Sequence, residues 1–476
     1  MRSTPSSISH KYASQQTPGN DPIAFEKYVG TLFAKRGYRV EDTRASADEG
    51  IDLIVRQGRR MAVVQCKRYQ GSVDQPVVRD LYGVTLAPTA TEAAVIDRDA
   101  TDMPTPAPLQ TRAAPIAPPH TGDGEMEALA VAANGAAVYA YNEGGYSRLW
   151  RVDLTTGERA KVAGLPEGQI GHISVKMDGT LVCDVQTPQR NLDIWLVETD
   201  GTARPLTQSD RAGLDSASFV SSQLIHFPTF DGLSIPAFYY LPQTPQPAGG
   251  YPCILYIHGG PTSQLRPDFD VRFQYFLSRG YAILGTNVRG SAGYGRAYAA
   301  LDEIEKRPDS VTDLKHAVLW LHQRAEIDSN RVAVYGRSYG GYMVLAALTA
   351  YPELFAAGID VVGIANWVSF MERTSPWRRA HREQEYGSLS HHKDVLERIS
   401  PIHQAERITM PLLVIAGDND PRVPLFESEL IVEKVRGNGG TVEFLHYADE
   451  GHKISKLNNR IDSFTKMAAF LDKSLG

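Results

Sequence analysis

Cysteine is scarce in this sequence, with Cys66, Cys183 and Cys253 the only three among 476 residues. An odd and widely spaced set gives neither a disulfide framework nor a paired-cysteine zinc site, so we expect a reducing compartment. Long apolar runs are missing as well: no window approaches the ~20 uninterrupted apolar residues that cross a bilayer. The polar segment 1–20 also lacks the apolar stretch of a secretory signal. These absences predict a cytoplasmic protein with no membrane partner and a disordered tail over 1–20.

An excess of charge of one sign is absent too. Lys and Arg number 49 against 55 Asp and Glu, which gives a formal net charge of -6. This balance argues against a nucleic-acid or membrane surface that extends over the whole chain. With 42% hydrophobic and 22% charged residues the composition is that of a globular protein, and at roughly 100–200 residues per domain the length predicts two to four folded units.

What the sequence does have is a concentration of proline between residues 85 and 125, set among Ala and Thr. Closely spaced prolines remove backbone donors and favour extended chain, so 85–125 is predicted to be a linker. It separates an N-terminal module, 21–84, from the rest. In that module, apolar residues at helical spacing precede two short apolar runs, 51–55 and 61–65, that predict a β-hairpin.

Two similar segments follow the linker, within residues 126–225. Each is a predicted strand with a central tryptophan, Trp150 or Trp195, and each leads into a turn that ends in Gly. A repeat of roughly 40–50 residues with one such strand per unit is typical of propeller blades. Two chance hairpins in a small β-sheet explain the pattern equally well. The segment is therefore predicted to be either a partial β-propeller or a small sheet.

From residue 226 to the C-terminus, apolar runs alternate with amphipathic stretches, which predicts an α/β domain with a mainly parallel sheet covered on both faces. The predicted strands cover 253–257, 281–285, 331–335, 359–363, 412–416 and 442–447, and one predicted helix between them covers 311–324.

The strand at 331–335 runs directly into Gly336-Arg337-Ser338-Tyr339-Gly340 and then into an apolar helix. A strand, a sharp turn and a helix form the nucleophile elbow that exposes a serine hydroxyl, and glycines two residues to each side leave room for it. A glycine-rich turn without chemistry has the same letters, so the interpretation of Ser338 depends on its partners.

A serine hydroxyl needs a base, and the base needs an orienting acid. The strand at 412–416 leads into a loop with Asp418 and Asp420, and the next strand leads into a loop with His452. The carboxyl ends of parallel strands meet at one edge, so these loops are expected near Ser338. Both aspartates satisfy the chemistry, and each residue alone also fits an ordinary turn. The backbone N–H groups of Tyr339 and of Gly260, in His258-Gly259-Gly260-Pro261, are the predicted oxyanion donors.

These motifs, with Asn287-Val-Arg-Gly-Ser-Ala-Gly-Tyr-Gly295 and Asp420-Pro-Arg-Val-Pro424, resemble the prolyl oligopeptidase family of serine peptidases, above all its acylaminoacyl-peptidase and dipeptidyl-peptidase branches. The resemblance implies an α/β-hydrolase fold over 226–476, a Ser338, Asp420 and His452 triad, and Arg422 as a ligand of a substrate carbonyl. Family members usually carry a complete propeller, whereas only about two blades fit here. A truncated propeller exposes apolar surface, which a homo-oligomer would cover.

In the N-terminal module, Asp48-Glu-Gly-Ile-Asp52 and Val64-Gln65-Cys66-Lys67 resemble the Mrr-like restriction endonucleases. That likeness implies a small α/β module in which Glu26, Asp52, Gln65 and Lys67 form a nuclease site, with Mg²⁺ held by Asp52. Such an ion would neutralise a phosphate under attack. Glu49 stands where the family has a second Gly, so a truncated, inactive remnant is the alternative to a module that binds or cleaves DNA.

The sequence thus predicts a serine peptidase that acts on short peptides and needs no cofactor. An esterase with the same triad is one alternative, because both reactions pass through the same tetrahedral intermediate. A Mg²⁺-dependent DNA endonuclease is another, and two inactive remnants fused by deletion are a third. Trp367 is a candidate for the specificity pocket, although core packing explains it as well.

Overall fold

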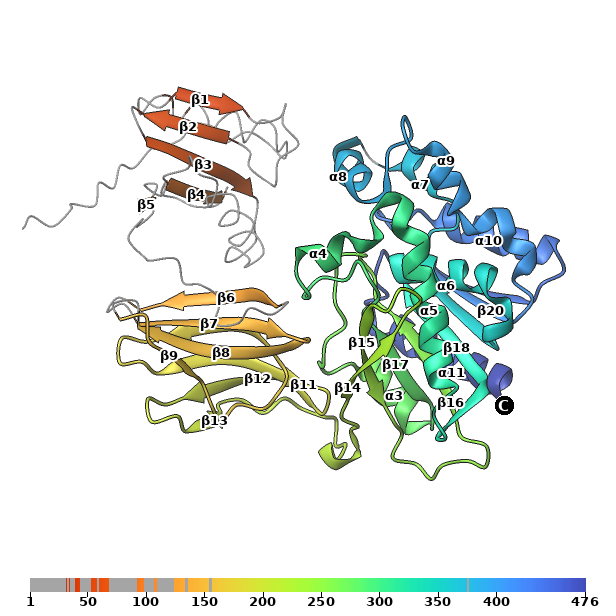
Figure 1. Cartoon of the computed structure of the whole chain (residues 1–476), viewed down its shortest axis with the longest axis horizontal. Coiled ribbons are helices and arrows are strands. Elements are labelled where there is room, and N and C mark those ends of the chain that lie inside the picture. Colours follow the sequence, from red (N-terminus) through yellow and green to blue (C-terminus); the bar gives the residue numbers. More distant parts are fainter. Residues whose placement is uncertain are drawn as a thin grey trace, which may run out of the picture. The chain divides into compact units, whose positions relative to one another are not determined.

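The computed structural model describes residues 124–476 apart from 133–135, 154, 155 and 375 (Figure 1). Before residue 124 it describes Thr31, Ala34 and the segments 39–42, 53–57, 60–67, 92–97 and 107–108. The chain divides into two compact units, Met1–Ile116 and Ala117–Gly476. None of the helices in these described parts is long and apolar enough to cross a membrane.

The described part of the first unit is a five-stranded sheet whose order follows the sequence. Its strands are β1 (Arg39–Asp42), β2 (Leu53–Gln57), β3 (Arg60–Lys67), β4 (Glu92–Asp97) and β5 (Ala107–Pro108). Antiparallel pairing of β2 with β3 confirms the predicted hairpin, because Leu53 lies opposite Val64 and Gln57 opposite Arg60. The apolar residues that predict the preceding helix, between 25 and 33, lie outside the described residues.

The predicted linker over 85–125 is wrong in its first half, because the sheet continues through it. β4 runs parallel to β3 over its whole length, from Glu92 opposite Ala62 to Asp97 opposite Lys67. The apolar pair Val95 and Ile96 suits a strand, and pairing with β3 satisfies the backbone donors that a linker would leave to water. The surrounding Pro, Ala and Thr residues make this short apolar run difficult to recognise as a strand in the sequence. The boundary between the two units, after Ile116, does fall inside the predicted segment.

The second unit begins with two four-stranded antiparallel sheets, each in sequence order. Trp150 and Trp195 both lie on the third strand of their sheet, so the repeat is structural and the partial propeller-like prediction is confirmed. One apolar core, which includes Val138, Leu149 and Val185, joins the two sheets. The first sheet contains β6 (Glu125–Val131), β7 (Ala136–Glu143), β8 (Tyr146–Asp153) and β9 (Arg159–Lys161), and the second contains β10 (Gln169–Val175), β11 (Leu181–Thr187), β12 (Arg190–Val197) and β13 (Ala203–Pro205).

The first strand of this segment carries the apolar surface that the sequence predicts for a truncated propeller. On β6, Met126, Leu129 and Val131 are 45%, 43% and 55% exposed. Exposed apolar side chains along one strand are typical of a surface that packs against further structure. Self-association of this chain remains a prediction.

The hydrolase domain is built on an eight-stranded sheet of order β14-β15-β17-β16-β18-β19-β20-β21 (Figure 1). The pairs from β17 to β21 are parallel, whereas β14 and β15 pair antiparallel. This confirms the predicted α/β class and all six predicted strands. The strands are β14 (Gln223–Pro228), β15 (Ser234–Tyr240), β16 (Tyr251–Ile257), β17 (Ala282–Thr286), β18 (Ile327–Arg337), β19 (Ala357–Val361), β20 (Leu412–Gly417) and β21 (Val442–Tyr447).

Helices cover both faces of this sheet. Side chains of α5, α6 and α10 form one apolar core with one face of the strands, and side chains of α3 and α11 form a second core with the other face. Along β16 the alternation is strict, since Cys253 and Leu255 belong to the first core while Ile254 and Tyr256 belong to the second. The helices are α3 (Val271–Ser278), α4 (Arg296–Ala299), α5 (Arg307–Leu321), α6 (Tyr339–Ala350), α7 (Trp367–Arg373), α8 (Pro376–Tyr386), α9 (Lys393–Arg398), α10 (Leu425–Gly437) and α11 (Leu457–Leu475), with short 3₁₀ turns η1 (Ser216–Ser218), η2 (Ala300–Asp302), η3 (Ile304–Lys306), η4 (Pro352–Leu354) and η5 (Pro401–Arg407).

The first small sheet contacts the hydrolase domain through the loop that follows β16. Arg266 in this loop forms a largely buried ion pair with Glu127 of β6, and its Nε donates to the Gly145 carbonyl at 2.8 Å. Two residues earlier, Gln264 Oε1 accepts from Asn142 Nδ2 at 2.7 Å. The loop is therefore held from the side of the first sheet.

Candidate active site

Ser338 stands at a sharp turn between β18 and α6. Its backbone has φ 61° and ψ -121°, a conformation that costs an L-residue about 1–3 kcal/mol. Two hydrogen bonds hold it there: its N–H donates to the Val361 carbonyl at 2.8 Å, and its carbonyl accepts from the Tyr342 N–H at 3.1 Å. Strain of this kind is what the nucleophile elbow requires, and it turns the hydroxyl out of the sheet edge.

The glycines on either side of Ser338 are required by packing. A Cβ on Gly336 would lie 2.2 Å from the Gly340 carbonyl oxygen, and a Cβ on Gly340 would lie 2.3 Å from the Ile257 carbonyl oxygen. Both neighbours are backbone atoms, which can move aside only if the backbone conformation changes. The sequence pattern around the serine therefore reflects the close contact of the elbow with β16.

Three side chains from three strand ends form one chain of hydrogen bonds. His452 Nε2 lies 3.0 Å from Ser338 Oγ, and His452 Nδ1 lies 2.7 Å from Asp420 Oδ2. The Asp420 side chain is 1% exposed and that of His452 is 10% exposed. The other oxygen of Asp420 accepts from the backbone N–H of Arg422 at 2.7 Å and of Val423 at 3.1 Å. This arrangement fixes the carboxylate against the imidazole.

The structure distinguishes the two aspartates that the sequence left open. Asp418 Oδ1 lies 2.9 Å from His446 Nδ1, at an exposed position on β21, so Asp418 does not contact His452. The loop that carries His452 has an anchor of its own. Glu450, 2% exposed, accepts hydrogen bonds from the backbone of Ser455 and Lys456 and from other groups of that turn. No sequence pattern indicated this role of Glu450.

The two predicted oxyanion donors lie at the same edge of the sheet. Tyr339 is the first residue of α6, where a backbone N–H has no acceptor within the helix. Gly259, next to Gly260, packs against the nucleophile, since a Cβ on it would lie 3.4 Å from the Ser338 Cβ. The Gly260 carbonyl accepts a hydrogen bond from the Tyr386 hydroxyl at 3.1 Å. The assignment of the donors themselves remains a prediction.

A fully buried guanidinium, which no motif indicated, lies behind these two loops. Arg307 Nη1 donates to Asp302 Oδ2 at 2.8 Å and to the Tyr339 hydroxyl at 2.9 Å, while Nη2 donates to Glu385 Oε1 at 2.8 Å. Its charge also lies over the rings of Tyr339 and Tyr386, at 5.2 and 5.0 Å from their centroids. Burial raises the pKa of Asp302 to about 6 even though Arg307 opposes the shift. Arg307 thus contacts Tyr339 directly and reaches the Gly260 loop through Tyr386.

Comparison with known families identifies the two ends of the chain. Residues 267–476 match the prolyl oligopeptidase family. The hydrolase domain is a prolyl oligopeptidase family domain. Residues 19–104 match a restriction endonuclease family, which confirms the second resemblance and extends it past the predicted module end at residue 84.

Relatives of the prolyl oligopeptidase domain are peptidases. The chain is 28% identical over 338 residues to dipeptidyl peptidase family member 6 of Caenorhabditis elegans, which covers 65% of this chain and 46% of the relative. It is 29% identical over 326 residues to dipeptidyl aminopeptidase BIII of Pseudoxanthomonas mexicana, which covers 62% of this chain and 46% of the relative. The chain therefore spans about half the length of the curated relatives that it matches.

Solved structures show the same relation. A puromycin-hydrolysing peptidase of Mycobacterium tuberculosis superimposes with a TM-score of 0.68 at 26% identity, covering 73% of this chain and 53% of that one. The acylaminoacyl peptidase of Pyrococcus horikoshii superimposes with a TM-score of 0.66 at 25% identity, covering 74% of this chain and 56% of that one. These likenesses agree with the α/β-hydrolase and propeller-like assignment.

Two further predictions concern substrate contacts of the prolyl oligopeptidase domain. Arg422 is exposed beside Asp420, and its carbonyl accepts from Arg382 Nη2 at 2.7 Å. The substrate role of its side chain stays a prediction. Trp367 is fully buried and packs against Tyr342 and Tyr386 at centroid distances of 4.9 and 4.5 Å. Core packing therefore explains Trp367, and it does not line a substrate pocket.

The predicted nuclease site lies largely outside the described residues. Glu26 and Asp52 are not among them, while Gln65 and Lys67 are placed on β3 without a description of their side chains. Among the residues that are described, no group of three or more His, Cys, Asp or Glu side chains is arranged to hold a metal ion. The Mg²⁺ site at Asp52 therefore remains a prediction.

Proposed function

We propose that the chain is a serine peptidase that cleaves short peptides through an acyl-enzyme on Ser338. The observation that carries this proposal is the hydrogen-bonded series from Asp420 to His452 to Ser338 at the carboxyl edge of the sheet, with separations of 2.7 and 3.0 Å. Membership of the hydrolase domain in a peptidase family supports it. Relatives named for dipeptide release, for acylated amino acids and for puromycin support a small substrate.

In the first half-reaction, Ser338 Oγ attacks the substrate carbonyl carbon while its proton passes to His452 Nε2. The Asp420 carboxylate stabilises the imidazolium that forms. Backbone N–H groups of Tyr339 and Gly260 would receive the developing oxyanion. His452 then gives the proton to the leaving amine as the C–N bond breaks. Water repeats the sequence in the second half-reaction, so the acid product leaves and Ser338 regains its proton.

The test is labelling with a fluorophosphonate probe together with turnover of aminoacyl p-nitroanilides and p-nitrophenyl esters. We expect labelling and anilide turnover in the wild type and neither in Ser338→Ala. If the wild type turns over esters but no anilide, and Ser338→Ala loses the ester turnover, the protein is an esterase and the peptidase proposal fails. Absence of labelling in folded wild-type protein would rule out both.

A second activity is favoured by the restriction endonuclease match over residues 19–104 and by the sheet that carries β2, β3 and β4. We propose that this module cleaves DNA with Mg²⁺ bound at Asp52 and Gln65, while Lys67 activates water. Plasmid incubated with and without Mg²⁺ tests this. Nicking should require Mg²⁺ and be lost in Lys67→Ala. Equal nicking by that variant, or none by the wild type, would leave the module as a binding domain or a remnant.

A further inference from the structure

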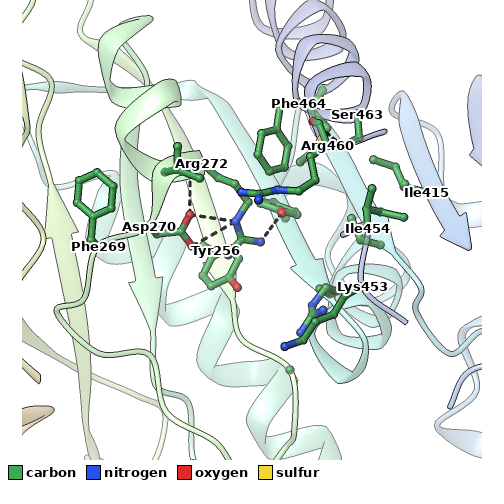
Figure 2. Close-up of a pocket in the computed structure, with 16 residues that line it drawn as sticks. Tyr256, Phe269, Asp270, Arg272, Ile415, Lys453, Ile454, Arg460, Ser463 and Phe464 are labelled. Carbon is green, nitrogen blue, oxygen red and sulfur yellow. Dashed lines mark hydrogen bonds and ion pairs between the residues drawn. The ribbon is translucent and has the colours of Figure 1, made fainter. Parts of the chain in front are cut away.

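A cavity of about 380 Å³ lies on the face of the sheet that α3 and α11 cover, at the carboxyl ends of the central strands (Figure 2). Its lining includes Gly259, Arg337 and Lys453, each of which is the direct chain neighbour of a predicted active-site residue. Arg337 Nη1 lies 3.4 Å from the His452 carbonyl oxygen. The cavity therefore lies directly beside the predicted active site, and its volume is that of a small-ligand pocket.

The charge of this cavity is strongly positive. Four of its lining residues are basic, namely Arg272, Arg337, Lys453 and Arg460, and Asp270 is its single acid. Asp270 is committed to Arg272, whose Nη1 also donates to the Tyr335 hydroxyl at 3.0 Å, as the dashed lines in Figure 2 show. The charges of Asp270 and Arg272 cancel. Arg337, Lys453 and Arg460 are then the lining residues whose positive charge no acid of the cavity balances.

None of these three cations has an acidic partner in the described part of the chain, although Arg337 donates to the His452 carbonyl and Arg460 lies over the Phe464 ring. Among the described residues, no carboxylate lies within ion-pair distance of Arg337, Lys453 or Arg460. Lys453 is exposed, while Arg337 and Arg460 are half-buried. Aromatic side chains complete the walls, including Phe269 and Phe464. A partly enclosed site with three basic side chains beside apolar walls suits a carboxylate attached to an apolar side chain.

The position of the cavity relative to His452 decides which part of a substrate it would receive. The imidazole must pass its proton to the leaving amine, so the leaving fragment has to run past His452. Lys453 and Ile454, which follow His452, form part of the cavity wall. The cavity thus lies on the leaving-group side.

We infer that this cavity binds a carboxylate on the leaving fragment of the substrate, so that the enzyme favours peptides whose free C-terminus follows closely after the scissile bond. The inference rests on the proposed peptidase function. The carboxylate would contact Arg460 and Lys453, and the last side chain would pack against Phe464. A carboxamide in the same place would bind more weakly because it lacks the charge.

The experiment first finds peptides that the full-length wild-type protein cleaves, by mass spectrometry on a mixture of random-sequence peptides. A cleaved peptide is then made as the free acid, as the C-terminal amide, and as an amide with Asp in place of its last residue. The last form separates a terminal from a side-chain carboxylate. We expect kcat/KM for the free acid to exceed that for the amide about tenfold. Arg460→Gln and Lys453→Gln should each reduce this ratio to threefold or less.

Lys466→Gln is the matched control, because Lys466 lies on the same helix as Arg460 but outside the cavity, paired with Asp462. It should leave the ratio unchanged. Equal rates for acid and amide in the wild type, or an unchanged ratio in Lys453→Gln, whose exposed side chain can be replaced without unfolding, would overturn the inference. Anilide turnover separates the two proposals, since a p-nitroaniline leaving group has no carboxylate. If neither anilide nor any peptide is cleaved, the peptidase itself fails; if anilide is cleaved and acid equals amide, only the cavity assignment fails.

Discussion

Replacement of Arg307 by methionine is the most informative single change for the structural claims, because one buried charge connects both predicted oxyanion loops. The change removes hydrogen bonds to Asp302, Tyr339 and Glu385, all at 2.8 or 2.9 Å. It also removes the charge over the rings of Tyr339 and Tyr386. Methionine keeps much of the side-chain volume, so lost charge pairing rather than a cavity dominates the effect.

The expected cost is about 3–5 kcal/mol in the free energy of unfolding, the range for removal of one partner from a buried ion pair. Its pH dependence follows from Asp302. Burial raises the pKa of Asp302 to about 6 with Arg307 present, and the loss of Arg307 raises it further. Wild-type Asp302 ionises as pH rises through 6, whereas the variant either keeps a proton or buries an unpaired charge. The destabilisation should therefore be larger at pH 8 than at pH 5.

Urea unfolding at pH 5 and pH 8 measures the cost, and the rate of fluorophosphonate labelling of folded protein reports on the site. Labelling should slow at least tenfold in Arg307→Met, because Tyr339 and Gly260 lose a common support. Arg279→Met is the control: its partner Asp472 is about half exposed, so we expect less than about 1 kcal/mol and no change in labelling. The double variant Arg307→Met with Asp302→Asn should recover part of the stability. A cost below about 1 kcal/mol, or one without pH dependence, would refute the reasoning.

Three further predictions concern the elbow, the acid and a buried carboxyl. Asp420→Asn should lower peptidase kcat on the order of 10⁴-fold by favouring the wrong imidazole tautomer, whereas Asp418→Asn should change it less than about twofold; similar losses in the two variants would contradict the assignment. Gly340→Ala should destabilise the fold by about 3 kcal/mol in urea unfolding and abolish probe labelling of Ser338, because the new Cβ would meet a backbone carbonyl at 2.3 Å; wild-type labelling would show that the elbow tolerates a methyl group. Burial raises the pKa of Asp360 from 3.8 to about 7, although the backbone N–H of Gly363 opposes this shift, so the contribution of Asp360 to stability is full below pH 4 and is lost as pH rises through 7. Between pH 5 and pH 8 the free energy of unfolding of Asp360→Asn should therefore fall by about 3 kcal/mol less than that of the wild type. The same pH profile for both proteins in urea unfolding would contradict this.

The sequence predicted the hydrolase sheet well, for a physical reason. A parallel sheet covered on both faces buries every side chain of its strands, so strands such as β16, β19 and β20 appear as short continuous apolar runs. Helix α5 begins four residues earlier than predicted, at Arg307-Pro308, because proline is favoured in the first helical turn. The same logic failed at β4, where two apolar residues among Ala and Thr gave too weak a signal.

The candidate site was predictable where the chemistry is local and unpredictable where it depends on distant partners. Ser338 could be found because its elbow needs glycines at fixed offsets. Asp420 could be separated from Asp418 only by resemblance, since the choice depends on which carboxylate the backbone of residues 422 and 423 turns toward His452. Arg307 contacts Glu385, which lies 78 residues further along the chain, and no spacing in the sequence predicts such a contact. Buried charge networks of this kind become visible only in the fold.

The two small sheets have a consequence for the site even though they cannot close a propeller. The loop that carries Gly260 continues into Gln264 and Arg266, which hydrogen-bond to Asn142 and pair with Glu127 of the first sheet. A donor in a loop stabilises a transition state only if the loop is already in place before charge develops. The first sheet therefore acts on the predicted oxyanion site through six residues of chain, as a support rather than as a filter. It follows that the hydrolase domain cut free at residue 226 would lose this support while keeping Ser338, Asp420 and His452 unchanged in sequence.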